Sequence, residues 1–262
     1  MILVATSGYS YQDWRGPFYP ADLPSSRMLG YYAGHFPFVE VNTTFYRMPD
    51  ERLLTSMAER TPGGFTFVVK AFQGLTHQHR EIGPSALDAS FAQFRNAVEC
   101  LVPDGRLAAI LAQFPNAFRN NPPNQAFLKR WRAEMGELPV LVEFRHRSWL
   151  TDEVQALLRQ ERLGFVAVDE PRLPGLLPPV PWTTARPGYV RFHGRNYAKW
   201  WRHEASHERY DYRYSEEELA EWVPVLRRME AEVGLVLVAM NNHFQGSAPL
   251  NAKQLTNLLQ MS

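Results

Sequence analysis

The sequence contains very little cysteine and almost no net charge. Its 262 residues include one cysteine, Cys100, and 28 lysines and arginines oppose 27 aspartates and glutamates. A single cysteine excludes an internal disulfide and a cysteine-rich zinc site, and it fits the reducing cytoplasm, where we expect the protein. A net charge of +1 provides no general attraction to nucleic acid or to anionic lipid. Such a partner would need a local charged patch.

Long apolar runs are also missing. No apolar stretch approaches the roughly 20 residues that a membrane-spanning helix needs. The first ten residues, "MILVATSGYS", have no basic region, and their apolar run is too short for a signal peptide. We therefore expect no membrane partner.

The sequence does contain eight short apolar runs of the kind that form buried parallel strands. They cover residues 2–6, 38–42, 66–70, 108–114, 140–144, 165–169, 189–193 and 235–239. Most of the gaps between them carry helical patterns, with cap residues such as Asp50, Thr151 and the Ser215–Glu218 capping box. Eight strand–helix units in a chain of this length predict an α/β fold, a (β/α)8 TIM-type barrel formed by residues 1–262 as a single domain.

One gap departs from this pattern. Residues 170–188, "EPRLPGLLPPVPWTTARPG", contain too many prolines for a good helix. We interpret them as an irregular crossover between strands six and seven. A doubly wound open sheet is the alternative fold, but "TSGYSY" after the first strand is a poor match to the glycine-rich turn typical of that fold.

Polar residues gather at the C-terminal ends of the predicted strands, which is where barrel enzymes carry their chemistry. These residues are Glu40, Lys70, Glu143, Arg145, Asp169, His193, Arg195, Asn241 and Asn242. Because side chains alternate along a strand, Glu143 shares a face with Arg145, and Arg191 shares one with His193 and Arg195. If these faces point inward, the polar groups converge on one pocket. Ion pairing that merely stabilises the barrel is the alternative for any single residue.

The first functional hypothesis is an enzyme, for example a hydrolase, that acts on an anionic or polyhydroxylated small molecule. The candidate catalytic residues are Glu143 as general acid or base, Glu40 or Asp169 as second carboxylate, and His193 as proton shuttle. Arg195 and Asn242 would clamp the anion, because barrels often bind phosphate in the loops after strands seven and eight. Further candidate ligand-binding residues are Lys70, Arg145, Asn241, Tyr9, Trp14 and Tyr46.

A metal-dependent variant would use Glu40, Glu143, Asp169 and His193 as ligands of a divalent ion. The nearby cations Lys70, Arg145 and Arg195 oppose it, and the H-x-H and E-x-x-H spacings are missing. We therefore expect no cofactor and keep a divalent metal as the less favoured alternative.

Two other functional classes remain open. In one, the stretch "YAKWWRHEASHER" after strand seven binds single-stranded nucleic acid, because basic and aromatic side chains alternate there. Low net charge weakens that hypothesis. In the other, the protein is a non-catalytic small-molecule sensor.

Several motifs together resemble one protein family. "TSGYSYQDWRGPFYP", "FVEVNTTFYRMP", "FTFVVKAFQGLTH", "VEFRHRSW", "YVRFHGR" and "NNHFQGSAPLNA" occur in this order between residue 4 and about residue 252. They are similar to the YecE-like family, the domain of unknown function numbered 72. Tyr9 stands where the family usually has tryptophan, and Thr43 where it usually has serine. The resemblance implies a TIM-barrel-type fold and leaves the activity open.

Overall fold

Eight parallel strands form the centre of the molecule. The computed structural model describes residues 1–202 and 204–261. Its strands are β1 (Ile2–Thr6), β2 (Phe38–Val41), β3 (Thr66–Lys70), β4 (Leu107–Gln113), β5 (Val140–Glu143), β6 (Leu163–Asp169), β7 (Gly188–Phe192) and β8 (Val236–Met240). Each predicted run is a strand, with ends that agree to within two residues. The prediction of a (β/α)8 TIM-type barrel is confirmed.

The strands follow one another around the barrel in the order β1-β8-β7-β6-β5-β4-β3-β2. The seam between β1 and β2 is the weak point of the ring. There the backbone N–H of Gly8 donates to the carbonyl of Glu40 at 2.8 Å, in a bridge between Ser7 and Glu40. The barrel is therefore nearly closed, and the closing contact lies at the C-terminal end, beside the polar residues.

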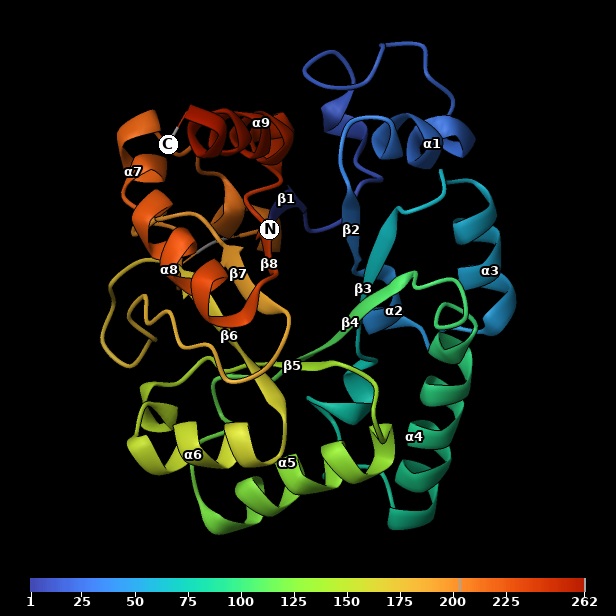
Figure 1. Ribbon diagram of the computed structural model, residues 1–262, viewed down its shortest axis with the longest axis vertical. Helices are drawn as coiled ribbons and strands as arrows, with labels where there is room; N and C mark the ends of the chain where they lie inside the picture. The colour runs from blue at the N-terminus through green and yellow to red at the C-terminus, as the bar shows by residue number, and fades with distance from the viewer. Residues whose placement is uncertain (203, 262) are drawn as a thin grey trace.

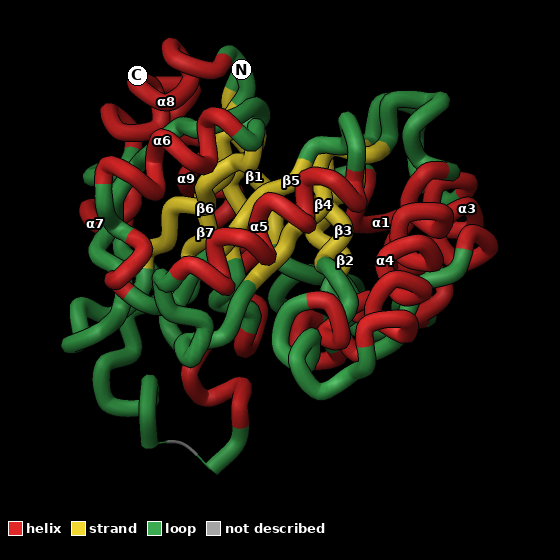
Figure 2. The backbone as a smooth tube through the Cα atoms, turned by 90° about the horizontal axis from the view of Figure 1, so that it is seen from below, coloured by secondary structure: helices red, strands yellow, loops and turns green. Residues whose placement is uncertain are grey.

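Helices surround the strands (Figures 1 and 2). They are α1 (Met28–Ala33), α3 (Glu51–Glu59), α4 (Pro84–Glu99), α5 (Pro122–Met135), α6 (Asp152–Gln160), α7 (Glu216–Ala220), α8 (Val223–Val233) and α9 (Ser247–Met261), with a single turn, α2 (Thr43–Tyr46), directly after β2. Short 3-10 turns occur at Gln12–Trp14, Ser25–Arg27, Gln73–Leu75, Arg147–Trp149, Ser206–Tyr210 and Phe244–Gly246.

The predicted caps of three helices are present. Asp50 accepts from the N–H of Leu53, Thr151 accepts from that of Val154, and Ser215 and Glu218 form the capping box of α7. These bonds satisfy backbone donors that the first helical turn leaves unpaired. They fix where these helices begin after the loops at the C-terminal end of the barrel.

The crossover between β6 and β7 contains no helix, as predicted from its prolines. Residues 170–187, all of them described, run irregularly over the outer face of β6. Trp182 packs against Phe165 there, with ring centroids 5.1 Å apart. The Thr184 hydroxyl donates to the carbonyl of Leu163 and accepts from the N–H of Phe165. This segment therefore covers the strand where another barrel would place a helix.

No helix in residues 1–202 and 204–261 is both long enough and apolar enough to pass through a lipid bilayer.

Candidate functional site

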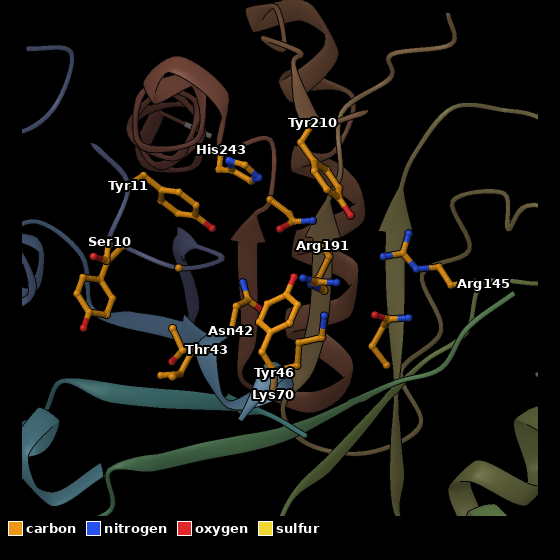
Figure 3. Close-up of a pocket in the computed structure, with 15 residues that line it drawn as sticks. Ser10, Tyr11, Asn42, Thr43, Tyr46, Lys70, Arg145, Arg191, Tyr210 and His243 are labelled. Carbon is orange, nitrogen blue, oxygen red and sulfur yellow. The ribbon is translucent and has the colours of Figure 1, made fainter. Parts of the chain in front are cut away.

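A pocket of about 320 Å³ opens among the C-terminal ends of the strands (Figure 3). The polar and aromatic side chains that line it come from most of the barrel. They are the cations Lys70, Arg145 and Arg191, the amides Asn42, Gln113 and Asn241, and the rings of Tyr9, Tyr11, Tyr46, Tyr210 and His243. A pocket of this size lies in the range that small-molecule sites occupy.

Arg191 on β7 is the centre of the pocket floor. It is 1% exposed and donates from Nε and Nη2 to both carboxylate oxygens of Glu40, at 2.9 and 2.7 Å. Its Nη1 donates to Glu143 at 2.6 Å, and the hydroxyl of Tyr189 donates to Glu40 at 2.8 Å. Such planar, bidentate pairing is the form in which a guanidinium and a carboxylate tolerate burial.

A second arginine continues this network towards β6. Arg145 lies 2.7 Å from Glu143 through Nη2, and its Nη1 donates to Glu170 at 3.1 Å. Burial by itself would raise the pKa of Glu143, but the charges of Arg145 and Arg191 outweigh it and hold that pKa well below its usual value. Burial raises the pKa of Glu170 to about 7 despite its contact with Arg145. Glu143 is therefore a fixed anion, and Glu170 is partly protonated near neutral pH.

His193 lies beneath the pocket as a neutral imidazole. The Asn241 side-chain amide lies 2.8 Å from Nδ1, and Nε2 is 3.3 Å from Glu143 Oε1. If the amide nitrogen donates to Nδ1, the ring proton is on Nε2 and faces the carboxylate. Burial, followed by the charge of Arg145, lowers the pKa of His193 to about 3. A ring that stays neutral at physiological pH is a poor proton shuttle, so it helps to orient Glu143.

Lys70 at the end of β3 differs from the other two cations of the pocket, Arg145 and Arg191, which both pair with Glu143. No carboxylate oxygen of a described residue lies within 4.0 Å of its Nζ, which instead lies 4.4 Å from the centre of the Phe45 ring. Burial, and then the charge of Arg191, lower the pKa of Lys70 to about 8. Figure 3 shows this side chain below Arg191 and beside Tyr46 in the pocket.

Aromatic rings form the upper wall of the pocket. Tyr11 stacks on His243 with ring centroids 4.6 Å apart and planes 7° apart, and Tyr210 lies 5.4 Å from the same imidazole. The loops after β1, β7 and β8 therefore meet here. Tyr46, 74% exposed, stands at the edge of the opening. Exposed rings of this kind offer flat apolar faces to a ligand.

The structure brings most of the predicted site residues together. The pocket is lined by Tyr9, Tyr46, Lys70, Arg145 and Asn241, and Glu40, Glu143 and His193 lie behind this lining.

The sequence predicted the positions of two other site residues, Asp169 and Arg195, wrongly. Both point to the outside of the barrel, where Arg195 donates to the two oxygens of Asp169 at 2.9 and 2.8 Å. Gly194 has a φ of +90°, which ends the strand alternation and turns Arg195 away from His193.

Asn242 and Trp14 also lie outside the pocket. The Asn242 amide donates to the carbonyl of Tyr212 at 2.9 Å and to the side chain of Asn251 at 2.8 Å. The Trp14 indole is fully buried and donates to the carbonyl of His243 at 2.7 Å. Trp14 therefore supports the aromatic wall from behind, and the predicted clamp of Arg195 with Asn242 does not form. The pocket's cations come from β3, from the end of β5 and from β7.

Sequence reasoning missed Glu170, Tyr11 and Tyr210. Glu170 directly follows Asp169, so one of these two adjacent acids had to face inward, and that was the available signal. Tyr11 belongs to the quoted "TSGYSYQDW" motif. Tyr210 comes from a long loop, and no pattern in the sequence predicts that it returns to the pocket.

The sequence left two other uses of this end of the barrel open, a metal site and a nucleic-acid-binding loop. Both find little support in the side-chain contacts. Among the described residues, no three His, Cys, Asp or Glu side chains form a group that could hold a metal ion. In the loop after β7, Lys199 pairs with Glu208 at 2.7 Å, and Arg209 donates to the carbonyl of Trp200. Those cations are engaged with the protein itself, although Trp201 and Tyr197 are more than half exposed.

Comparison with known proteins places the chain in a family. Residues 3–262 match the model of "Protein of unknown function DUF72". The UPF0759 protein YunF of Bacillus subtilis (strain 168) is 32% identical over 272 residues, which span 100% of this chain and 95% of YunF. The crystal structure of a DUF72 family protein from Thermotoga maritima MSB8 is 39% identical, with a TM-score of 0.90 over 99% of both chains. One from Enterococcus faecalis V583 is 27% identical, with a TM-score of 0.88 over 100% of this chain and 96% of that one. The chain therefore belongs to the DUF72 family, whose function is unknown.

Proposed function

We propose that the protein binds a small anionic, hydroxylated molecule, such as a sugar phosphate or sugar acid, in the pocket at the C-terminal end of its barrel. One observation carries the proposal. Lys70, Arg145 and Arg191 line the pocket, whereas Glu40, Glu143 and Glu170 lie behind them. A ligand in the pocket therefore meets the cations first. Their charge is felt strongly there, because the surrounding barrel has a low dielectric constant.

The rest of the lining suits hydroxyl groups and a ring. Asn42, Gln113 and Asn241 place amide groups around the pocket, and amides both donate to and accept from hydroxyls. Tyr11, Tyr46 and Tyr210 provide ring faces against which a sugar or other flat group can pack. A pocket with a few convergent polar groups and apolar walls is the usual form of a small-molecule site.

Hydrolysis by two carboxylates, one of the reactions considered from the sequence, is less well supported than binding. Glu40 and Glu143 do not line the pocket, and both are held by Arg191. The lowered pKa of Glu143 makes it a poor general acid. We assign both glutamates the role of holding Arg191 and Arg145 in place.

The two other classes make different demands on the structure. A non-catalytic sensor would use the same pocket without any reaction. Binding of single-stranded nucleic acid would use the loop after β7, whose described cations are largely paired within the protein, so we rank it lower.

The test compares ribose 5-phosphate with ribose by isothermal titration calorimetry. We expect the phosphate to bind at least tenfold more tightly than the neutral sugar. Lys70→Met should weaken that binding by about tenfold, equivalent to about 1.4 kcal/mol. Lys129→Met is the matched control, because Lys129 lies on the exposed face of α5 and binding should not change.

Two results would overturn the proposal. One is the same affinity for ribose and ribose 5-phosphate. The other is equal binding by wild-type protein and Lys70→Met. A salt-sensitive shift of a single-stranded oligonucleotide, without binding of either sugar, would instead support the nucleic-acid class.

A further inference from the structure

The sequence has four lysines, at positions 70, 129, 199 and 253, and only one of them lies in the pocket. Lys129 is exposed on α5, and Lys199 is paired with Glu208 at 2.7 Å. Lys253 lies 5.3 Å from the ring of Phe18, in a separate depression beside the N-terminal part of β1. Each of these three has an ordinary role as a solvated or paired surface cation. Lys70 has no such role.

The Lys70 side chain is placed as a nucleophile needs to be. Its Nζ makes no hydrogen bond or ion pair with a described residue, so its lone pair is not engaged once a proton has left. The Phe45 ring lies under it at 4.4 Å, and Arg191 and Arg145 line the same pocket. Burial and neighbouring cations are the two conditions under which proteins activate a lysine amine.

We propose that Lys70 is a covalent-catalysis residue that forms an imine with the carbonyl group of an aldehyde or ketone bound in this pocket. This inference rests on the proposed function, because the anionic end of the same molecule would be held by Arg145 and Arg191. The substrate class is therefore a small carbonyl compound that carries a phosphate or carboxylate and one or more hydroxyls.

The reaction is balanced without any further reagent. The lone pair on neutral Nζ attacks the carbonyl carbon, and the carbonyl π electrons move to oxygen, which takes up a proton to give a carbinolamine. The carbinolamine hydroxyl then leaves as water with a second proton, and the C=N bond forms. The amine loses two N–H protons and the carbonyl oxygen takes up two, so the oxygen is released as one molecule of water. The water can leave because the pocket is open to solvent through its mouth.

The amine is available for this step at neutral pH. With a pKa of about 8, roughly a tenth of Lys70 is neutral at pH 7, about three hundredfold more than for an ordinary lysine. A lysine that served only as a charge for an anion would gain nothing from this loss of protonation. Arg145 and Arg191 already provide permanent positive charge in the pocket.

The experiment traps the imine. Wild-type protein is incubated with pyridoxal 5′-phosphate, which carries an aldehyde and a phosphate, and is then reduced with borohydride and mapped by peptide mass spectrometry. We expect Lys70 to be labelled about tenfold or more faster than Lys129 at pH 7, with a rate that rises with pH to a midpoint near 8. Pyridoxal, which lacks the phosphate, should label Lys70 more slowly, and inorganic phosphate should slow the phosphate-bearing probe.

Two variants identify the labelled amine. Lys70→Arg keeps a positive charge but cannot form an imine, so the fast-labelled peptide should disappear. Lys129→Arg is the matched control and should lose only a slowly formed adduct, with the labelling of Lys70 unchanged.

The results separate the two proposals. If ribose 5-phosphate binds but Lys70 is labelled no faster than Lys129, the imine proposal is wrong and anion binding stands. If Lys70 is labelled quickly by pyridoxal and pyridoxal 5′-phosphate alike, and inorganic phosphate has no effect, the reactive lysine stands and anion binding is wrong. Fast labelling of Lys70 that needs the phosphate and is slowed by inorganic phosphate supports both.

Discussion

The wall of the barrel separates two arginine–carboxylate centres that lie a few residues apart in the sequence. The outer centre joins Asp169 at the end of β6 to Arg195 after β7. The inner centre joins Glu170, the next residue, through Arg145 and Glu143 to Arg191. The carboxylates Asp169, Glu143 and Glu170 are all buried. The hydrogen bonding of the two centres differs, and the difference distinguishes a structural centre from a candidate site.

The outer centre is complete. Asp169 accepts two hydrogen bonds from Arg195, one from the Tyr214 hydroxyl at 2.8 Å and one from the Trp222 indole at 2.8 Å. Four donors are as many as a carboxylate accommodates. No part of Asp169 is left for a ligand, so its role is to attach α8 and the loop after β7 to the barrel wall.

The inner centre is incomplete. Glu170 Oε1 is buried without a well-aligned hydrogen bond to a described residue. Glu143 Oε1 contacts Arg145 Nη2 at 2.7 Å and His193 Nε2 at 3.3 Å, but neither contact is a well-aligned hydrogen bond. Lys70 lines the pocket, and no carboxylate oxygen of a described residue lies within 4.0 Å of its Nζ. Buried polar groups with unused hydrogen-bonding capacity are uncommon in folded proteins and require a reason. Here the reason lies next to them, because the arginines of this centre line a pocket.

The largest effect we expect is on stability, from removing the inner arginine. Arg191→Met leaves Glu40 buried without its main partner and Glu143 with Arg145 alone, which costs about 3–5 kcal/mol in the free energy of unfolding. Urea denaturation measures this. Arg95→Met, which breaks an exposed pair with Glu99, is the control and should cost less than about 1 kcal/mol. A loss from Arg191→Met as small as that of the control would contradict this view of the inner centre.

The outer centre should affect stability but not the pocket. Asp169→Asn removes the charge that Arg195 and the Trp222 indole share, and we expect a loss of about 2–3 kcal/mol in the free energy of unfolding. The rate at which pyridoxal 5′-phosphate labels Lys70 should stay at the wild-type value. A marked change in that rate would show that the two centres are coupled through the wall, and the distinction between them would fail.

The sequence predicted the inner centre better than the outer one, for a physical reason. Alternation along a strand placed Glu143 with Arg145, and Arg191 with His193, because those segments stay extended. The rule failed for Arg195, where Gly194 adopts a positive φ. The rule could not assign Asp169 to the inner or the outer face, because β6 is buried on both faces and "LGFVAVD" shows no polar alternation. The eight strands could be predicted because continuous apolar runs are a strong signal, whereas the return of Tyr210 depends on tertiary contacts.

A smaller effect is expected from Lys70, and it depends on pH. Its pKa falls from 10.5 in the unfolded chain to about 8 in the folded protein, so between these values the unfolded chain holds more protons. Burial of the charge therefore costs stability below pH 8, and the cost fades as the pH rises towards 10.5. The free energy of unfolding of Lys70→Met should exceed that of wild type by about 1–2 kcal/mol at pH 7. This is less than the full pKa shift of Lys70 would give, because the side chain reaches solvent.

Urea denaturation of this variant at pH 7, 8, 9 and 10 checks the prediction. The advantage of Lys70→Met should shrink steadily over this series. Lys129→Met, the exposed control, should stay within about 0.5 kcal/mol of wild type throughout. A Lys70→Met protein that is less stable than wild type at pH 7 would mean that the lysine has a stabilising partner after all.

The smallest effect on stability, and the sharpest test of the two regions, comes from two exposed tyrosines. Tyr46 stands at the mouth of the inner pocket, whereas the hydroxyl of Tyr197 accepts from the N–H of Arg172 on the outer side. Because both rings are more than half exposed, either change to alanine should alter the free energy of unfolding by less than about 1 kcal/mol. Only Tyr46→Ala removes a ring face from the pocket, which should slow the labelling of Lys70 by pyridoxal 5′-phosphate several-fold. Equal rates for the two variants would place the probe away from Tyr46, and a slower rate for Tyr197→Ala alone would move the binding site to the outer side of the barrel.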